Sequence, residues 1–106
     1  MVVADDDPDL RYLVRAALES SGSFEVVGEA GDGRAAIDAA ARDDPDIVLL
    51  DLSMPDLDGV QALPLIQRAA PGARVVVLSS FPSERMAPVA RSRGAVGYLE
   101  KGITPR

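Results

Sequence analysis

The sequence predicts a single α/β domain built on a doubly wound sheet of five parallel strands. Two observations support this fold class. Short apolar runs alternate five times with segments whose apolar residues recur at helical spacing, as in chains of strand–helix–strand units. Residues 47–50 (Ile-Val-Leu-Leu) and 75–78 (Val-Val-Val-Leu) are continuously apolar, which is typical of strands buried on both faces. A chain of 106 residues is large enough for one core and too short for two.

The first strand and helix are expected in residues 1–22. Residues 1–4 form an apolar strand, and Pro8 opens a helix because proline is tolerated at the first helical position. Asp7 or its neighbour can cap this helix, and Gly22 ends it. The helix presents one apolar stripe made of Leu10, Leu13, Val14, Ala17 and Leu18.

The middle of the chain repeats the alternation. We expect a second strand at residues 24–30, an alanine-rich helix at 34–42, the buried strand at 47–50 and a third helix at 60–70. Pro64 interrupts the third helix and should cost it a hydrogen bond.

The last third contains a buried strand at 75–78, a weak helical stretch at 83–93 and a fifth strand at 96–100. Because Pro88 is unfavourable inside a helix, we expect that helix to start late, near Ala87 or Pro88, and to leave residues 82–86 as a loop. No further helix follows, although the alternation requires one. We therefore expect an uncovered apolar strip that lowers stability or promotes self-association into a homodimer.

The composition excludes several classes of protein. The chain has no cysteine and no histidine, which excludes disulfides and thiol chemistry, excludes a histidine-assisted nucleophile, and argues against a zinc site. No apolar run approaches the ~20 residues of a membrane span, and no signal peptide is visible, so we expect a cytoplasmic protein. The net charge of −6 argues against nucleic-acid binding by this domain alone.

Polar residues follow the expected strands at four places. Asp5 and Asp6 follow the first strand, Asp51 the third, Ser79 the fourth, and Lys101, which is the only lysine, the fifth. Parallel topology brings these strand ends to one rim of the sheet. An oxygen-only set of carboxylates suits Mg²⁺, and a metal, a hydroxyl and an ammonium together can hold a phosphoryl group. Asp51 would then be the nucleophile that forms an aspartyl phosphate.

Each residue also has an ordinary structural explanation. Residues 5–7 could cap a helix, Asp51 and Ser79 could be turn residues, and Lys101 could be a solvated surface lysine. Tyr98 fits a core position. Four independent placements at four strand ends favour a site, and a lysine in a chain that otherwise uses arginine suits a compact point charge.

These residues carry a family resemblance. Asp5-Asp6, Asp51, Met54-Pro55, Asp58-Gly59, Ser79 and Gly97-Tyr98-x-x-Lys101 resemble, in order, the motifs of the receiver domain of two-component response regulators. Asp-Asp-x-Pro and Gly-Tyr-Leu-x-Lys resemble the NarL/FixJ-like subfamily. The resemblance implies a flavodoxin-like strand order 2-1-3-4-5, with residues 1–106 as a receiver domain that lacks its last helix and any effector domain.

The resemblance also implies a role for each matching residue. Asp51 would accept a phosphoryl group from a histidine of a partner kinase or phosphotransfer protein. Asp6, Asp51 and the backbone carbonyl of Ser53 would ligate Mg²⁺, with Asp5 acting largely through water. Lys101 and Ser79 would contact the phosphoryl group. Ser79 and Tyr98 would form the switch. DNA would be bound only through an effector domain absent from this chain.

Three departures and two alternatives accompany the resemblance. Glu100 replaces a residue that is often apolar in the subfamily, Gly102 replaces a proline common in other receivers, and Pro64 and Pro88 interrupt helices. An aspartyl-phosphate phosphohydrolase of the haloacid dehalogenase type would need a second aspartate where Ser53 stands. A receiver fold that had lost its chemistry is the other alternative, but its acids, hydroxyl and lysine are intact. We therefore expect a signalling switch rather than a separate enzyme.

Overall fold

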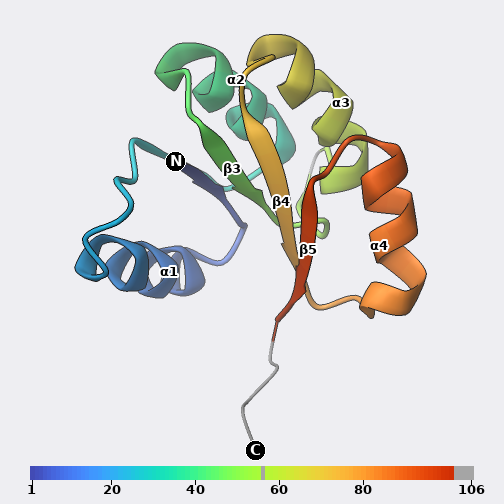
Figure 1. The fold of residues 1–106 in the computed structure, drawn as a ribbon, viewed down its shortest axis with the longest axis horizontal. Coiled ribbons are helices and arrows are strands. Elements are labelled where there is room, and N and C mark those ends of the chain that lie inside the picture. The colour runs from blue at the N-terminus through green and yellow to red at the C-terminus, as the bar shows by residue number, and fades with distance from the viewer. Residues whose placement is uncertain (56, 102–106) are drawn as a thin grey trace, which may run out of the picture.

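The computed structural model describes residues 1–55 and 57–101. Its centre is a sheet of five parallel strands in the order β2-β1-β3-β4-β5 (Figure 1). The strands are β1 (Val2–Ala4), β2 (Gly28–Ala30), β3 (Ile47–Leu50), β4 (Arg74–Ser79) and β5 (Gly97–Glu100). The predicted fold class and strand order are confirmed.

Four helices connect the strands within the described residues. They are α1 (Pro8–Ser20), α2 (Gly33–Asp43), α3 (Gly59–Ala69) and α4 (Ser83–Ser92). Aspartate side chains cap the first three: Asp7 accepts hydrogen bonds at the start of α1, Asp32 at α2 and Asp58 at α3. Along the described chain, no helix combines the length and apolarity that a membrane crossing requires.

The two faces of the sheet differ in how well they are covered. Alternate strand residues such as Val48, Leu50 and Val77 are fully buried in one core with α2, α3 and α4. On the other face, which carries α1, Leu49 and Leu78 remain only half-buried (Figure 1). This face is therefore the less protected part of the fold.

The stripe predicted for the first helix is only partly used. Leu10, Val14 and Leu18 are half-buried, whereas Leu13 and Ala17 are exposed and no residue of α1 is fully buried. The predicted helical spacing is correct, but the apolar stripe of α1 is wider than the sheet surface against which the helix packs.

Two boundaries differ from the sequence predictions. The strand expected at 24–30 is limited to Gly28–Ala30, because β1 offers only three residues as partners. The late start predicted for the fourth helix was wrong, since α4 begins at Ser83 and continues through Pro88. Pro88 and Glu84 are both exposed, so water can solvate the Glu84 carbonyl that the proline leaves without a donor.

Candidate functional site

The carboxyl ends of β1, β3, β4 and β5 meet at one rim of the sheet. Asp5 and Asp6 follow β1, Asp51 follows β3, Ser79 ends β4, and Lys101 follows β5. Backbone hydrogen bonds hold these ends together across the rim: the Asp51 amide donates to Ala4, and the Lys101 amide donates to Ser79. Positions as far apart in sequence as Asp5 and Lys101, which are separated by 96 residues, thereby become neighbours.

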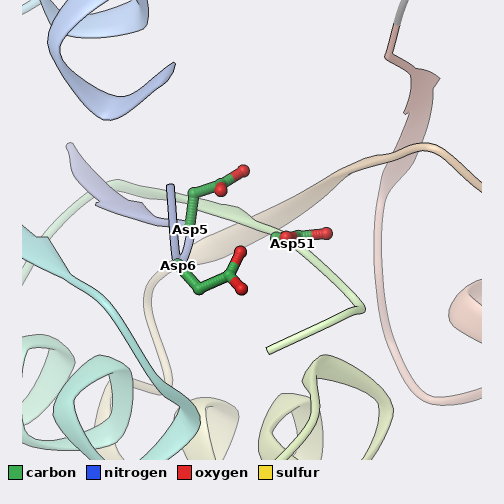
Figure 2. Close-up of side chains that lie close together, drawn as sticks. All are labelled: Asp5, Asp6 and Asp51. Atoms are coloured by element: carbon green, nitrogen blue, oxygen red, sulfur yellow. The ribbon is translucent and has the colours of Figure 1, made fainter. Parts of the chain in front are cut away.

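Three carboxylates form the centre of the rim (Figure 2). One oxygen from each of Asp5, Asp6 and Asp51 lies within 4.8 Å of the others. Asp5 and Asp51 are each 3% exposed, and Asp6 is exposed. An oxygen-only set of this spacing, open on one side, suits a hard divalent cation such as Mg²⁺.

Lys101 bridges the two buried carboxylates. Its Nζ lies 2.5 Å from Oδ2 of Asp5 and 3.2 Å from Oδ2 of Asp51. Burial of the ammonium acts in the opposite direction, but the hydrogen bond to Asp5 and the charge of Asp51 outweigh it and raise the pKa of Lys101. The lysine is therefore a fixed positive charge at neutral pH, beside both acids.

The ionised form of Asp51 is disfavoured even though Lys101 lies beside it. Burial raises the pKa of Asp51 above its ordinary value, and the charge of Asp5 raises it further. The backbone N–H of Ser53, which donates to Oδ1 at 3.1 Å, and Lys101 act in the opposite direction without outweighing the burial. A second cation beside Asp51, or conversion of its carboxylate to an ester-like group, would reduce the cost of burying this negative charge.

Gly59 allows α3 to start directly against the carboxyl end of β3. A Cβ atom at this position would lie only 2.2 Å from the backbone oxygen of Asp51. The Gly59 amide instead donates to the Leu52 carbonyl, and Asp58 forms a capping box with Gln61. The turn after Asp51 is thus held by backbone contacts and leaves its carboxylate at the rim.

Ser79 and Tyr98 meet at a common neighbour, Phe81. The buried Ser79 accepts a hydrogen bond at Oγ from the Phe81 amide at 3.1 Å, and the Tyr98 hydroxyl donates to the Phe81 carbonyl at 2.8 Å. Phe81 lies in the segment between β4 and α4. The two residues predicted to form the switch therefore contact opposite sides of one peptide segment.

Two contacts of the rim were not predicted from the sequence. Arg11 donates from Nη1 to the backbone carbonyl of Asp5. Glu100 accepts from the backbone N–H of Ser83, which lowers the pKa of Glu100 and supplies a cap that the Pro82 side chain cannot. The charge at position 100 signalled only a polar edge, and nothing in the spacing of Arg11 indicated that its side chain reaches back to Asp5.

Comparison with known proteins identifies the architecture. Residues 1–106 match the family described as "Response regulator receiver domain". The nitrate/nitrite response regulator protein NarL of Escherichia coli (strain K12) is 37% identical over 105 residues, which cover 99% of this chain and 49% of that protein. The chain thus spans about half the length of this curated relative.

Solved structures agree with this match. The signal receiver domain of NarL from Mycobacterium tuberculosis is 40% identical, with a TM-score of 0.89 over 97% of this chain and 83% of that one. CheY in the CheX-CheY-BeF3-Mg²⁺ complex from Borrelia burgdorferi is 27% identical, with a TM-score of 0.87 over 97% of this chain and 78% of the matched chain. These matches favour the receiver prediction over the phosphohydrolase alternative. The chain belongs to the receiver-domain family of two-component response regulators.

Proposed function

We propose that this chain is a phosphorylation-activated signalling switch in which Asp51 accepts a phosphoryl group in the presence of Mg²⁺. The observation that carries the proposal is the arrangement of the rim, in which a buried aspartate with a raised pKa lies between a lysine and two further carboxylates. A receiver would obtain the phosphoryl group from a phosphohistidine of a kinase or phosphotransfer protein. It would act in the cytoplasm.

Asp6, Asp51 and the backbone carbonyl of Ser53 are the proposed metal ligands. Asp5 is suited to an indirect role, because its Oδ1 accepts from the Asp7 amide and its Oδ2 from Lys101. When bound, Mg²⁺ would neutralise charge on the carboxylates and on the phosphoryl oxygens. The presence of Mg²⁺ and BeF3 in the related CheX-CheY complex supports Mg²⁺ as the cation.

The transfer itself is a displacement at phosphorus. A carboxylate oxygen of Asp51 bonds to the phosphorus of the phosphohistidine while the phosphorus–nitrogen bond breaks, and the electron pair remains on the imidazole nitrogen, which takes up a proton. Lys101 already lies 3.2 Å from Asp51, so a small movement brings its ammonium onto the phosphoryl oxygens. Ser79 would donate its hydroxyl hydrogen to another of these oxygens.

The switch follows from the contacts that Ser79 would give up. Its Oγ accepts from the Phe81 amide, and turning toward Asp51 breaks that hydrogen bond. Tyr98, which donates to the carbonyl of the same residue, is then free to move inward. The change would reach the surface formed by α4 and β5, and from there an output domain outside this chain that controls transcription.

Phosphorylation is tested by incubating the protein with Mg²⁺ and acetyl phosphate and measuring the intact mass. We expect one phosphoryl adduct that hydroxylamine removes, as it removes acyl phosphates, and no adduct in Asp51→Ala. Labelling that persists unchanged in Asp51→Ala would place the nucleophile elsewhere.

The switch is tested separately by NMR of Tyr98 after addition of beryllofluoride. We expect its ring signals to shift in the wild type and to shift less in Ser79→Ala, which should still accept phosphate. Tyr98 signals that do not respond in the wild type would disprove the coupling.

A further inference from the structure

Arg11 connects three separate segments near the acidic rim. From α1, its Nη1 lies 2.5 Å from the backbone oxygen of Asp5, and its Nε lies 3.3 Å from Oε1 of Glu29 in β2. Gly31 leaves room for the guanidinium, because a Cβ atom there would lie 3.3 Å from Nη1. A planar guanidinium can hold two such partners at once in a fixed geometry.

The backbone carbonyl of Asp5 lies where β1 ends and the rim begins. β1 ends at Ala4, and the Asp5 amide still pairs with Ala30 at 2.9 Å. The Asp5 side chain is occupied by Asp7 and Lys101, and the residue is 3% exposed. A buried carbonyl at this point needs a donor, and Arg11 supplies it.

The same carbonyl also controls the direction of Asp6. The Asp5 carbonyl and the Asp6 amide belong to one planar peptide unit, so fixing the oxygen fixes the plane from which Asp6 continues. Asp6 lies beside the other two carboxylates (Figure 2) and is the exposed member of the cluster. Because few neighbours pack around an exposed side chain, we expect its backbone to set its position.

We propose that Arg11 is a positioning residue for the metal site, acting through the Asp5–Asp6 peptide. The inference rests on the proposed function, since it assumes that the cluster binds Mg²⁺ during phosphorylation. Arg11 is not one of the proposed metal ligands, since its side chain contacts the Asp5 carbonyl and Glu29. It holds the loop after β1 in the conformation from which Asp6 would reach the cation.

Arg15 provides a matched control one turn along α1. It also pairs with Glu29, at 2.7 Å through Nη1, but its other partner is Glu19 rather than Asp5. Arg11→Ala and Arg15→Ala therefore both remove a positive charge and an ion pair with Glu29. Only the first removes the donor to the Asp5 carbonyl.

The experiment follows two readouts as a function of Mg²⁺ concentration: the melting temperature of the protein without a phosphoryl donor, and the initial rate of phosphorylation by acetyl phosphate. For Arg11→Ala we expect the half-saturating Mg²⁺ concentration to rise about tenfold, the lower end of what groups that orient metal ligands contribute. The rate at saturating Mg²⁺ should stay within about twofold of the wild type. Arg15→Ala should match the wild type in both quantities.

A further variant makes the outcome decisive. Arg11→Lys keeps the charge but cannot bridge Asp5 and Glu29, so it should lie between the wild type and Arg11→Ala. If Arg11→Ala melts below the assay temperature, Arg11→Lys carries the test, with a smaller rise in the half-saturating Mg²⁺ concentration than the tenfold expected for Arg11→Ala.

Two failures can be told apart. Equal Mg²⁺ dependence in the Arg11 and Arg15 variants, or a loss confined to the rate at saturation, would overturn the positioning role alone. A wild-type protein that is not phosphorylated under any Mg²⁺ concentration would overturn the proposed function itself.

Discussion

The interior of the domain and its carboxyl rim bury side chains of opposite kinds. Within the described residues, the three buried polar or charged side chains, Asp5, Asp51 and Ser79, all lie at the rim. The largest side chains buried below it, such as Leu63 and Ile66, are apolar. Burial of apolar groups stabilises the fold, whereas burial of a like-charged pair costs stability. The rim is therefore the part of the fold where buried side chains cost stability, as is typical of functional sites.

The largest effect should come from truncating a leucine of the buried interior, compared with a leucine on the less covered α1 face of the sheet. Leu63 of α3 is 0% exposed, and Leu13 of α1 is 63% exposed. Leu63→Ala should lower the free energy of unfolding by ~2–5 kcal/mol because it leaves a cavity. Leu13→Ala should change it by no more than ~0.5 kcal/mol. Denaturant unfolding of both variants measures this, and similar losses would mean that the two faces are equally packed.

Covering the α1 face should give the next largest effect. Leu13 of α1 is 63% exposed, and Leu99, which pairs with Leu78 on this face, is 55% exposed. A chain extended by one amphipathic helix that buries ~100 Å² of this apolar surface should gain about 2.5 kcal/mol, or the shorter chain should associate through this face. Thermal melts of both versions measure the gain in stability, and light scattering shows whether the shorter chain associates. A monomeric short chain that melts as high as the extended one would show that the face needs no cover.

Removing the negative charge of Asp51 should stabilise the fold, in contrast to the truncation of Leu63. Because the pKa of Asp51 is raised in the folded state, protonation stabilises the fold below the unfolded pKa of ~3.9, and this contribution is lost as the pH rises through the folded pKa. At about pH 7 the ionised wild type therefore bears a cost that Asp51→Asn removes. We expect the variant to melt several degrees higher, since ~1 kcal/mol corresponds to ~4–8 °C in a domain of this size.

The pH dependence provides the control for this prediction. The difference in melting temperature between Asp51→Asn and the wild type should shrink as the pH falls through the raised pKa of Asp51, because the wild-type carboxyl then becomes protonated. A variant that is less stable at neutral pH would show that the ion pair with Lys101 outweighs the burial of Asp51.

The contrast between interior and rim also explains what the sequence could reveal. The apolar runs at 47–50 and 75–78 and the strand-end positions of Asp51 and Lys101 were visible because period and order along the chain determine them. The start of α4 was not. The sequence showed the local cost of Pro88 within the helix, but it did not show that Glu100 of β5 caps the start of α4.

Arg11 illustrates the same limit at the site. Its partners are a backbone oxygen six residues earlier and a carboxylate on β2, and neither leaves a periodic signal. The length of the second strand depended similarly on its partner, since β1 supplies only three residues for pairing. Sequence patterns report what a residue does within its own element, and tertiary contacts decide the rest.

The central claim is that the acidic rim is a metal site built on Asp6 and Asp51, and Mg²⁺-dependent thermal stability tests it most directly. At a concentration 100 times its dissociation constant, Mg²⁺ should stabilise the wild type by ~2.7 kcal/mol. Asp6→Ala should lose most of this gain. Asp7→Ala should keep it while melting lower without metal, because Asp7 caps α1. A wild-type melting temperature that ignores Mg²⁺, or equal losses of the Mg²⁺ effect in both variants, would contradict the account.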